Sequence, residues 1–118
     1  MHVLIIDDNR SNLDLAAYLL EAFGHSAVAV DNAVQALAEA RRGRYDLVLV
    51  DIKLPDTDGY RLARDLKGVV GSTPIIAFTA LAMAGDRVMA LNAGFDDYIA
   101  KPIDPDEFVL TLERINRR

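Results

Sequence analysis

Short apolar runs alternate with amphipathic segments along the whole of this chain. The run at 47–50 shows no alternation of polar and apolar residues, which is typical of a strand buried on both faces. The predicted strands lie at 2–6, 27–30, 47–50, 74–78 and 98–100. Each strand is followed by a longer and more polar segment.

These longer segments have helical periodicity and recognisable start and stop signals. They predict helices at about 11–23, 33–42, 59–67 and 85–93, and a last one from 105 onward. The last helix has the clearest start, because Asp104 can act as N-cap, Pro105 suits the first helical position, and Glu107 can return a bond to the cap. Either Asp31 or Asn32 caps the second helix.

The strict alternation of strand and helix determines the expected fold class. It favours right-handed crossovers and one parallel sheet with helices on both faces. The 118 residues suffice for one ordinary domain with its own core and leave no room for a second domain. We therefore expect a single α/β domain over 1–118, with its ligand site beyond the carboxyl ends of the strands.

Composition narrows the function classes. The net charge of −5 argues against direct nucleic-acid binding, and the absence of Cys excludes disulfides and thiolate catalysis. His2 and His25 are too far apart for a His-rich metal site. The apolar runs are too short to cross a membrane and no leader opens the chain, so we expect a cytoplasmic protein. The Arg residues at 41, 42, 44, 114, 117 and 118 are expected near helix C-terminal ends.

Polar residues follow four of the apolar runs at the point where each predicted strand ends. Asp7 and Asp8 follow the first run, Asp51 the third, Thr79 the fourth and Lys101 the fifth. Because the carboxyl ends of parallel strands meet at one edge of a sheet, these side chains are expected to converge.

Clustered carboxylates at this edge would repel one another without a cation. Two charges about 4 Å apart repel by roughly 4 kcal/mol at an effective dielectric near 20. Magnesium removes this cost, using one or two carboxylates together with waters and phosphate oxygens. The sequence therefore predicts a site for Mg²⁺, or the similar Mn²⁺, and a phosphoryl group.

Each of these residues also has an ordinary explanation when taken alone. Asp8 or Asn9 can cap the first helix, and Asp51 can simply end a strand. Thr79 can bond backbone at a strand end, and Tyr98 can be a half-buried strand residue. The combination of the residues, more than any one of them, favours a functional site.

Four motifs resemble those of a known family. They are the acidic pair in LIIDDN, the acceptor in LVLVDIKLPDTDG, FTA after the fourth strand and YIAKP after the fifth. Over essentially its whole length, the chain resembles the receiver domain of bacterial two-component response regulators, in the manner of single-domain chemotaxis regulators. The resemblance implies a flavodoxin-like (βα)5 three-layer sandwich with a five-stranded parallel sheet in order 2-1-3-4-5, which a chemotaxis member exemplifies.

The resemblance also implies a role for each residue at the site. Asp51 would take a phosphoryl group from a phosphohistidine, as a carboxylate nucleophile. Asp8 and Asp51 would bind Mg²⁺ directly, Asp7 largely through water, and Lys53 through its backbone carbonyl. Lys101 would reach the phosphoryl oxygens, and the protein would act mainly by positioning groups and neutralising charge.

Further residues are implied as a switch and as controls on access. Thr79 would bond the new phosphoryl group and Tyr98 would turn inward. The small Ala80 would leave the site open to a donor, and the bond between Lys101 and Pro102 can be cis. Lys53 and Leu81 would flank the path of attacking water, and we expect Leu81 to slow autodephosphorylation. Thr57 stands where an apolar residue is common, which concerns loop packing only.

The implied partners are a sensor histidine kinase or histidine phosphotransfer protein as donor, and a downstream target or output domain. The fourth helix, fifth strand and fifth helix would form the partner face, where Met83, Val88 and Met89 are either exposed or core residues. The protein would be a monomer or a weak phosphorylation-dependent dimer, without nucleic-acid or membrane binding. It would not be an enzyme beyond its own phosphorylation and dephosphorylation.

Three alternatives stay open. The receiver can be excised from a hybrid kinase or multidomain regulator, or be a scaffold that binds partners unphosphorylated. It can also be an aspartate phosphatase, but these need an acid two positions after the nucleophile, and Lys53 stands there.

Overall fold

The computed structural model describes residues 1–80 and 84–117. Its strands are all parallel and form one sheet in the order β2-β1-β3-β4-β5. Their bounds are β1 His2–Ile6, β2 Ser26–Val30, β3 Leu47–Asp51, β4 Ile75–Thr79 and β5 Asp97–Ala100. The predicted α/β class and the strand order 2-1-3-4-5 are confirmed.

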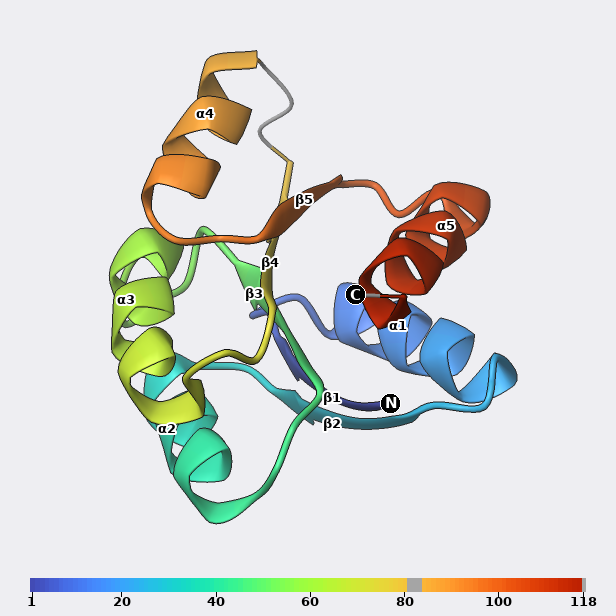
Figure 1. Ribbon diagram of the computed structural model, residues 1–118, viewed down its shortest axis with the longest axis horizontal. Helices are drawn as coiled ribbons and strands as arrows, with labels where there is room; N and C mark the ends of the chain where they lie inside the picture. Colours follow the sequence, from blue (N-terminus) through green and yellow to red (C-terminus); the bar gives the residue numbers. More distant parts are fainter. Residues whose placement is uncertain (81–83, 118) are drawn as a thin grey trace.

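Helices cover both faces of this sheet (Figure 1). Their bounds are α1 Arg10–Ala22, α2 Ala33–Arg42, α3 Gly59–Val70, α4 Ala84–Asn92 and α5 Pro105–Asn116. In Figure 1, α1 and α5 lie on one side of the strands, while α2 and α3 lie on the other. The result is the expected three-layer arrangement.

Alternate residues along each central strand contribute to two separate cores. In β3, Val48 and Val50 pack towards α2 and α3, whereas Leu47 and Leu49 pack towards α1 and α5. Every residue of this strand is therefore buried on one face or the other. This explains physically why its sequence is apolar without alternation.

Side-chain caps begin the helices close to the predicted positions. The N-cap of α1 is Asn9 and that of α2 is Asn32, which resolves the alternatives with Asp8 and Asp31. The Asp104 carboxylate caps α5 by accepting hydrogen bonds from the N–H groups of residues 106 and 107, at 3.0 and 3.4 Å. In the described part of the chain, no bond returns from the Glu107 carboxylate to this cap.

One helix is longer than the sequence predicts. The pattern suggests an end for α3 near Lys67, but the helix continues through Gly68 to Val70. Val69 and Val70 pack against the core on the α2 side, which compensates for the helix-weakening glycine. The chain turns instead at Gly71, whose φ of 64° is readily adopted only by glycine.

Three arginines lie near helix C-terminal ends, as expected. Arg41 and Arg42 lie in the last turn of α2 and Arg114 in the last turn of α5. None of the described helices has the length and hydropathy that spanning a bilayer requires.

Candidate functional site

The carboxyl ends of four strands bring the predicted residues to one edge of the sheet. Asp7 directly follows β1, Asp51 ends β3, Thr79 ends β4 and Lys101 follows β5. The strands end in step, because the Cα of Asp51 pairs with that of Phe78, one residue before Thr79. Parallel pairing thus places residues far apart in sequence side by side.

Three carboxylates form a cluster at this edge. Asp7, Asp8 and Asp51 each offer an oxygen, and these oxygens lie within 4.8 Å of one another. Asp7 is completely buried and Asp51 is 4% exposed, whereas Asp8 is exposed. Two of the charges are therefore removed from water and the third faces it.

One ammonium group serves both buried carboxylates. Lys101 Nζ lies 2.6 Å from Asp7 Oδ2 and 3.2 Å from Asp51 Oδ2, and its side chain is only 13% exposed. The same nitrogen lies 4.9 Å from the centroid of the Phe78 ring, a cation–π distance. Lys101 is thus held against both buried carboxylates.

The electrostatics of the cluster alter the acidity of Asp51. Burial, with a smaller contribution from the negative charge of Asp7, raises the pKa of Asp51 to about 6. The Lys53 N–H, which donates to Asp51 Oδ1 at 3.1 Å, and the charge of Lys101 lower this pKa but do not cancel the rise. The negative form of Asp51 is therefore under-compensated by the protein alone.

These residues fit a hard divalent cation. Three carboxylates and one ammonium leave two negative charges in excess. Asp7 Oδ2 is buried, and among the described residues its one close cationic partner, the Lys101 ammonium at 2.6 Å, is shared with Asp51. Two direct oxygen ligands of one Mg²⁺ lie at most about 4 Å apart, so carboxylate oxygens within 4.8 Å of one another suit an ion that binds some of them directly and another through water. Charge, ligand type and spacing all suit Mg²⁺.

The loop after β3 is closed tightly next to Asp51. Lys53 and Asp58 form an antiparallel bridge, and the Gly59 N–H donates to the Ile52 carbonyl at 2.6 Å. A Cβ on Gly59 would lie 2.5 Å from the Ile52 Cα and 2.6 Å from the Asp51 carbonyl oxygen. Only glycine permits this approach, so Gly59 helps to place the Asp51 backbone. From the sequence alone, Gly59 was predicted only to start a helix.

Comparison with known proteins identifies the family. The family model described as the response regulator receiver domain matches residues 3–113 of this chain. The chain belongs to this family.

Relatives of the receiver domain include both parts of kinases and separate regulators. The histidine-protein kinase BarA of Escherichia coli K12 is 41% identical over 90% of this chain, which spans only 12% of the kinase. The polar-differentiation response regulator DivK of Brucella anthropi is 38% identical, with 94% of this chain and 92% of DivK covered. The chain thus functions as a receiver domain of two-component systems.

A solved relative supports the character of the site. The receiver domain of sensor histidine kinase PA1611 from Pseudomonas aeruginosa PAO1 has a TM-score of 0.86 and 37% identity. The match covers 98% of this chain and 97% of that one. That structure is described as having a magnesium ion coordinated in its active site cleft.

The other predicted residues that the structure describes here lie in or next to β4 and β5. Thr79 is buried, and its carbonyl accepts the Lys101 N–H at 2.7 Å. Tyr98 is half-buried and its hydroxyl oxygen is inaccessible to solvent. Ala80 is exposed, and the Lys101–Pro102 peptide bond is cis. Leu81 lies outside the described residues.

Two further predictions concern the loop and the partner face. Lys53 is exposed and Thr57 half-buried. Val88 and Met89 of α4 are 57% and 56% exposed, so these two are surface residues and not core. Met83 lies outside the described residues.

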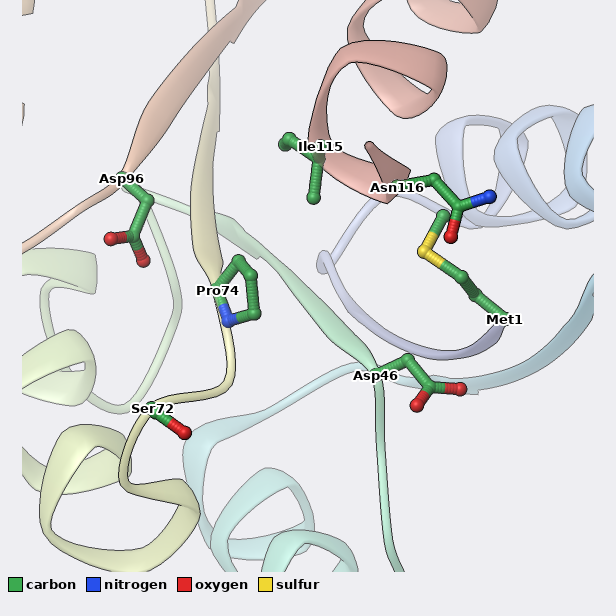
Figure 2. Close-up of a pocket in the computed structure, with 7 residues that line it drawn as sticks. All are labelled: Met1, Asp46, Ser72, Pro74, Asp96, Ile115 and Asn116. Atoms are coloured by element: carbon green, nitrogen blue, oxygen red, sulfur yellow. The ribbon is translucent and has the colours of Figure 1, made fainter. Parts of the chain in front are cut away.

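A cleft of about 540 Å³ lies at the opposite, amino-terminal edge of the sheet (Figure 2). It is lined by Met1, Asp46, Ser72, Pro74, Asp96, Ile115 and Asn116. Its carboxylates already have protein partners, since Asp46 accepts the His2 N–H at 2.7 Å and Asp96 accepts the Ile75 N–H at 2.7 Å.

Proposed function

We propose that this receiver domain accepts a phosphoryl group on Asp51 from a phosphohistidine of a sensor kinase or phosphotransfer protein. The observation that carries the proposal is the buried Asp51 carboxylate, held 3.2 Å from the Lys101 ammonium within a cluster of three carboxylates. The family and the acidic cluster support the same chemistry.

In the proposed step, an oxygen of Asp51 attacks phosphorus while the phosphorus–nitrogen bond of the donor breaks. The imidazole ring, with a proton from solvent on its other nitrogen, takes the electron pair of that bond and leaves as neutral histidine, and an acyl phosphate forms on Asp51. No general base is required, because a carboxylate with a pKa of about 6 is largely ionised at neutral pH. Lys101 would neutralise charge on the phosphoryl oxygens.

The proposed Mg²⁺ site uses the residues at the same edge. Asp8 and Asp51 would bind the ion directly, the Lys53 backbone carbonyl would add a third ligand, and Asp7 would act largely through water. Asp7 is buried against Lys101, whereas Asp8 is exposed and can reach an ion at the surface. When bound, Mg²⁺ would supply positive charge that offsets the negative charge of the carboxylates and of the phosphoryl group. Mn²⁺ has a similar ligand preference.

The proposed response to phosphorylation involves Thr79 and Tyr98. A phosphoryl group adds nearly two negative charges and strong acceptor oxygens. Thr79 ends β4 beside β3, which supports a role for its hydroxyl in bonding one of these oxygens. A movement of Tyr98 would then alter the surface of α4, β5 and α5, where Val88 and Met89 are exposed.

We further propose that this surface binds a downstream target or output domain. The relatives include a kinase with a receiver and a separate regulator, and either setting is compatible with the proposed chemistry. The chain would catalyse only its own phosphorylation and dephosphorylation, in the compartment of its kinase, the cytoplasm. Ala80 would leave the acceptor accessible, and Lys53 and Leu81 would set how fast water attacks.

The test is incubation with Mg²⁺ and acetyl phosphate, followed by measurement of the intact mass. The wild type should gain one phosphoryl group that mild base removes, and Asp51→Asn should gain none. Asp97→Asn is a matched control, since it alters a buried carboxylate at the opposite edge. An adduct that survives in Asp51→Asn, or none in the wild type, would refute the assignment.

A further inference from the structure

The loop that follows the acceptor strand is attached to α2 by one side chain. The Asp56 carboxylate accepts the Ala33 N–H, which lies 3.1 Å from each of its oxygens. The same carboxylate accepts the Val34 N–H at 3.4 Å. Ala33 and Asp56 are 23 residues apart in sequence, so this contact joins two distant parts of the chain.

The contact satisfies groups that a helix leaves unpaired. The first N–H groups of an α-helix have no partner within the helix, and the positive end of its dipole attracts an anion. In α2 the Asn32 side chain accepts the Gln35 N–H at 2.9 Å, while Asp56 serves the two residues before Gln35. Hydrogen bonds to a carboxylate are stronger than those between neutral groups, so the Asp56 side chain attaches the loop firmly to the start of α2.

The loop is therefore fixed at its base and at its tip. At the base, Lys53 pairs with Asp58, and the Gly59 N–H bonds the Ile52 carbonyl. At the tip, Asp56 holds the loop against α2. The two residues between Asp56 and Lys53 include a proline, Pro55, which has a fixed φ. A displacement of the tip would consequently be passed on to the backbone at residue 53.

We propose that Asp56 is a positioning residue for the metal site. By holding the tip of the loop against α2, it fixes the orientation of the Lys53 carbonyl as a ligand for Mg²⁺. This inference rests on the proposed function, which assigns that carbonyl to the ion. The Asp56 carboxylate does not itself bind the metal; it acts through the loop backbone.

A matched set of variants separates this role from a general effect of charge or helix stability. Asp56→Ala removes the attachment, and Asp56→Asn keeps one acceptor oxygen. Asp31→Ala removes a negative charge beside the same helix end, where Asp31 bonds only its neighbour Asn32 among the described residues. Comparison of the two Ala variants isolates the contact with the loop.

The experiment is a titration of each full chain with Mg²⁺ alone, followed by amide signals in NMR spectra of ¹⁵N-labelled protein. Asp56→Ala should bind Mg²⁺ about tenfold more weakly than the wild type, the lower end of the effect of removing a group that positions a metal ligand. Asp56→Asn should recover part of this loss, and Asp31→Ala should bind as the wild type does. The amide signals of Ala33 and Val34 should follow Mg²⁺ binding in the wild type and not in Asp56→Ala.

Distinct results would overturn the proposal. Unchanged Mg²⁺ affinity in Asp56→Ala, with altered Ala33 and Val34 signals, would show that Asp56 only caps α2. Equal weakening in Asp31→Ala would assign the effect to charge. A wild type that binds no Mg²⁺ would refute the proposed function itself, and the inference with it. If Asp56→Ala does not fold, Asp56→Asn gives the same comparison with a smaller expected loss.

Discussion

Carboxylates lie at both edges of the sheet, but the protein compensates their charges differently. At the amino edge, Asp96 accepts the Ile75 N–H at 2.7 Å and the Lys67 ammonium at 2.9 Å. Asp97, at the start of β5, has its own guanidinium, with Arg114 Nη2 at 2.7 Å. At the carboxyl edge, two buried carboxylates share a single ammonium, and a third adds to the negative charge.

The difference distinguishes a structural carboxylate from a functional one. A buried charge with its own donors can hold elements together, as Asp97 joins β5 to α5. A cluster with excess charge costs stability and persists only where another selective advantage exists. At the carboxyl edge, that advantage is the proposed capacity to bind a cation and a phosphoryl group.

Replacing the lysine at each edge should reveal the largest difference in stability between the two edges. Lys101→Met should lower the free energy of unfolding by about 3–5 kcal/mol at pH 7.5 without divalent ions, because it leaves two buried carboxylates uncompensated. Lys67→Met removes a cation that is 31% exposed, and should cost about 1 kcal/mol or less. Urea unfolding measures both values. Similar losses would mean that the two edges are electrostatically alike.

Replacing the Asp51 carboxylate with a neutral amide should stabilise the metal-free protein. The pKa of Asp51 is raised from 3.8 to about 6, so between these values the folded state binds more protons than the unfolded state. Stability therefore falls as pH rises through this window and stays low above it, by up to about 3 kcal/mol. Asp51→Asn should recover this amount at pH 7.5 and nothing below pH 3.8.

Urea unfolding of both proteins from pH 3.5 to 8 would measure this dependence. Asp97→Asn provides the contrast, because it should destabilise the fold by about 1–2 kcal/mol through weaker bonds to Arg114. A destabilised Asp51→Asn at pH 7.5 would show that the acceptor is compensated like Asp97.

Addition of Mg²⁺ should act on the carboxyl edge alone. At a hundred times its Kd, the ion should stabilise the wild type by about 2.7 kcal/mol, which raises Tm by about 10 °C. The shift should shrink at pH 5, where a proton competes for Asp51. It should be lost in Asp51→Asn and retained in Asp46→Asn, which alters a carboxylate at the amino edge. Thermal unfolding measured by circular dichroism can detect these shifts in Tm. Loss of the Mg²⁺-induced shift in Asp46→Asn would contradict the assignment of the ion to the carboxyl edge.

Two glycines of α3 differ in how closely the protein packs around them. A Cβ on Gly59 would lie 2.5 Å from the Ile52 Cα, so Gly59→Ala should destabilise the protein by about 1–3 kcal/mol. No atom lies within 4 Å of a Cβ on Gly68, in the same helix nearer the amino edge. Gly68→Ala should stabilise by about 0.5–1 kcal/mol, because alanine favours the helix. The free energy of unfolding of each variant should be compared with that of the wild type. Changes of the same sign in the two variants would contradict this difference in packing.

Much of the candidate site could be predicted, because its residues are polar side chains that directly follow or end short apolar runs. Asp7, Asp51 and Thr79 each follow or end a short apolar run, and parallel pairing then brings them to one edge. Their functional roles stay predictions. The closeness of Gly59 to the Asp51 backbone had no comparable signal, because a glycine at a helix start is compatible with many environments.

For the first two helices the sequence left two candidate caps each, and the structure selected Asn9 and Asn32. The sequence alone did predict the alternation of strands and helices, the Asp104 cap and the location of the acidic residues. These features depend on periodicity and hydrogen bonding over a few neighbouring residues. Only the tertiary structure decided that Lys101 bridges Asp7 and Asp51, that α3 continues to Val70, and that Asp56 bonds Ala33. Such contacts depend on distances between segments far apart in the chain, which local sequence patterns do not specify.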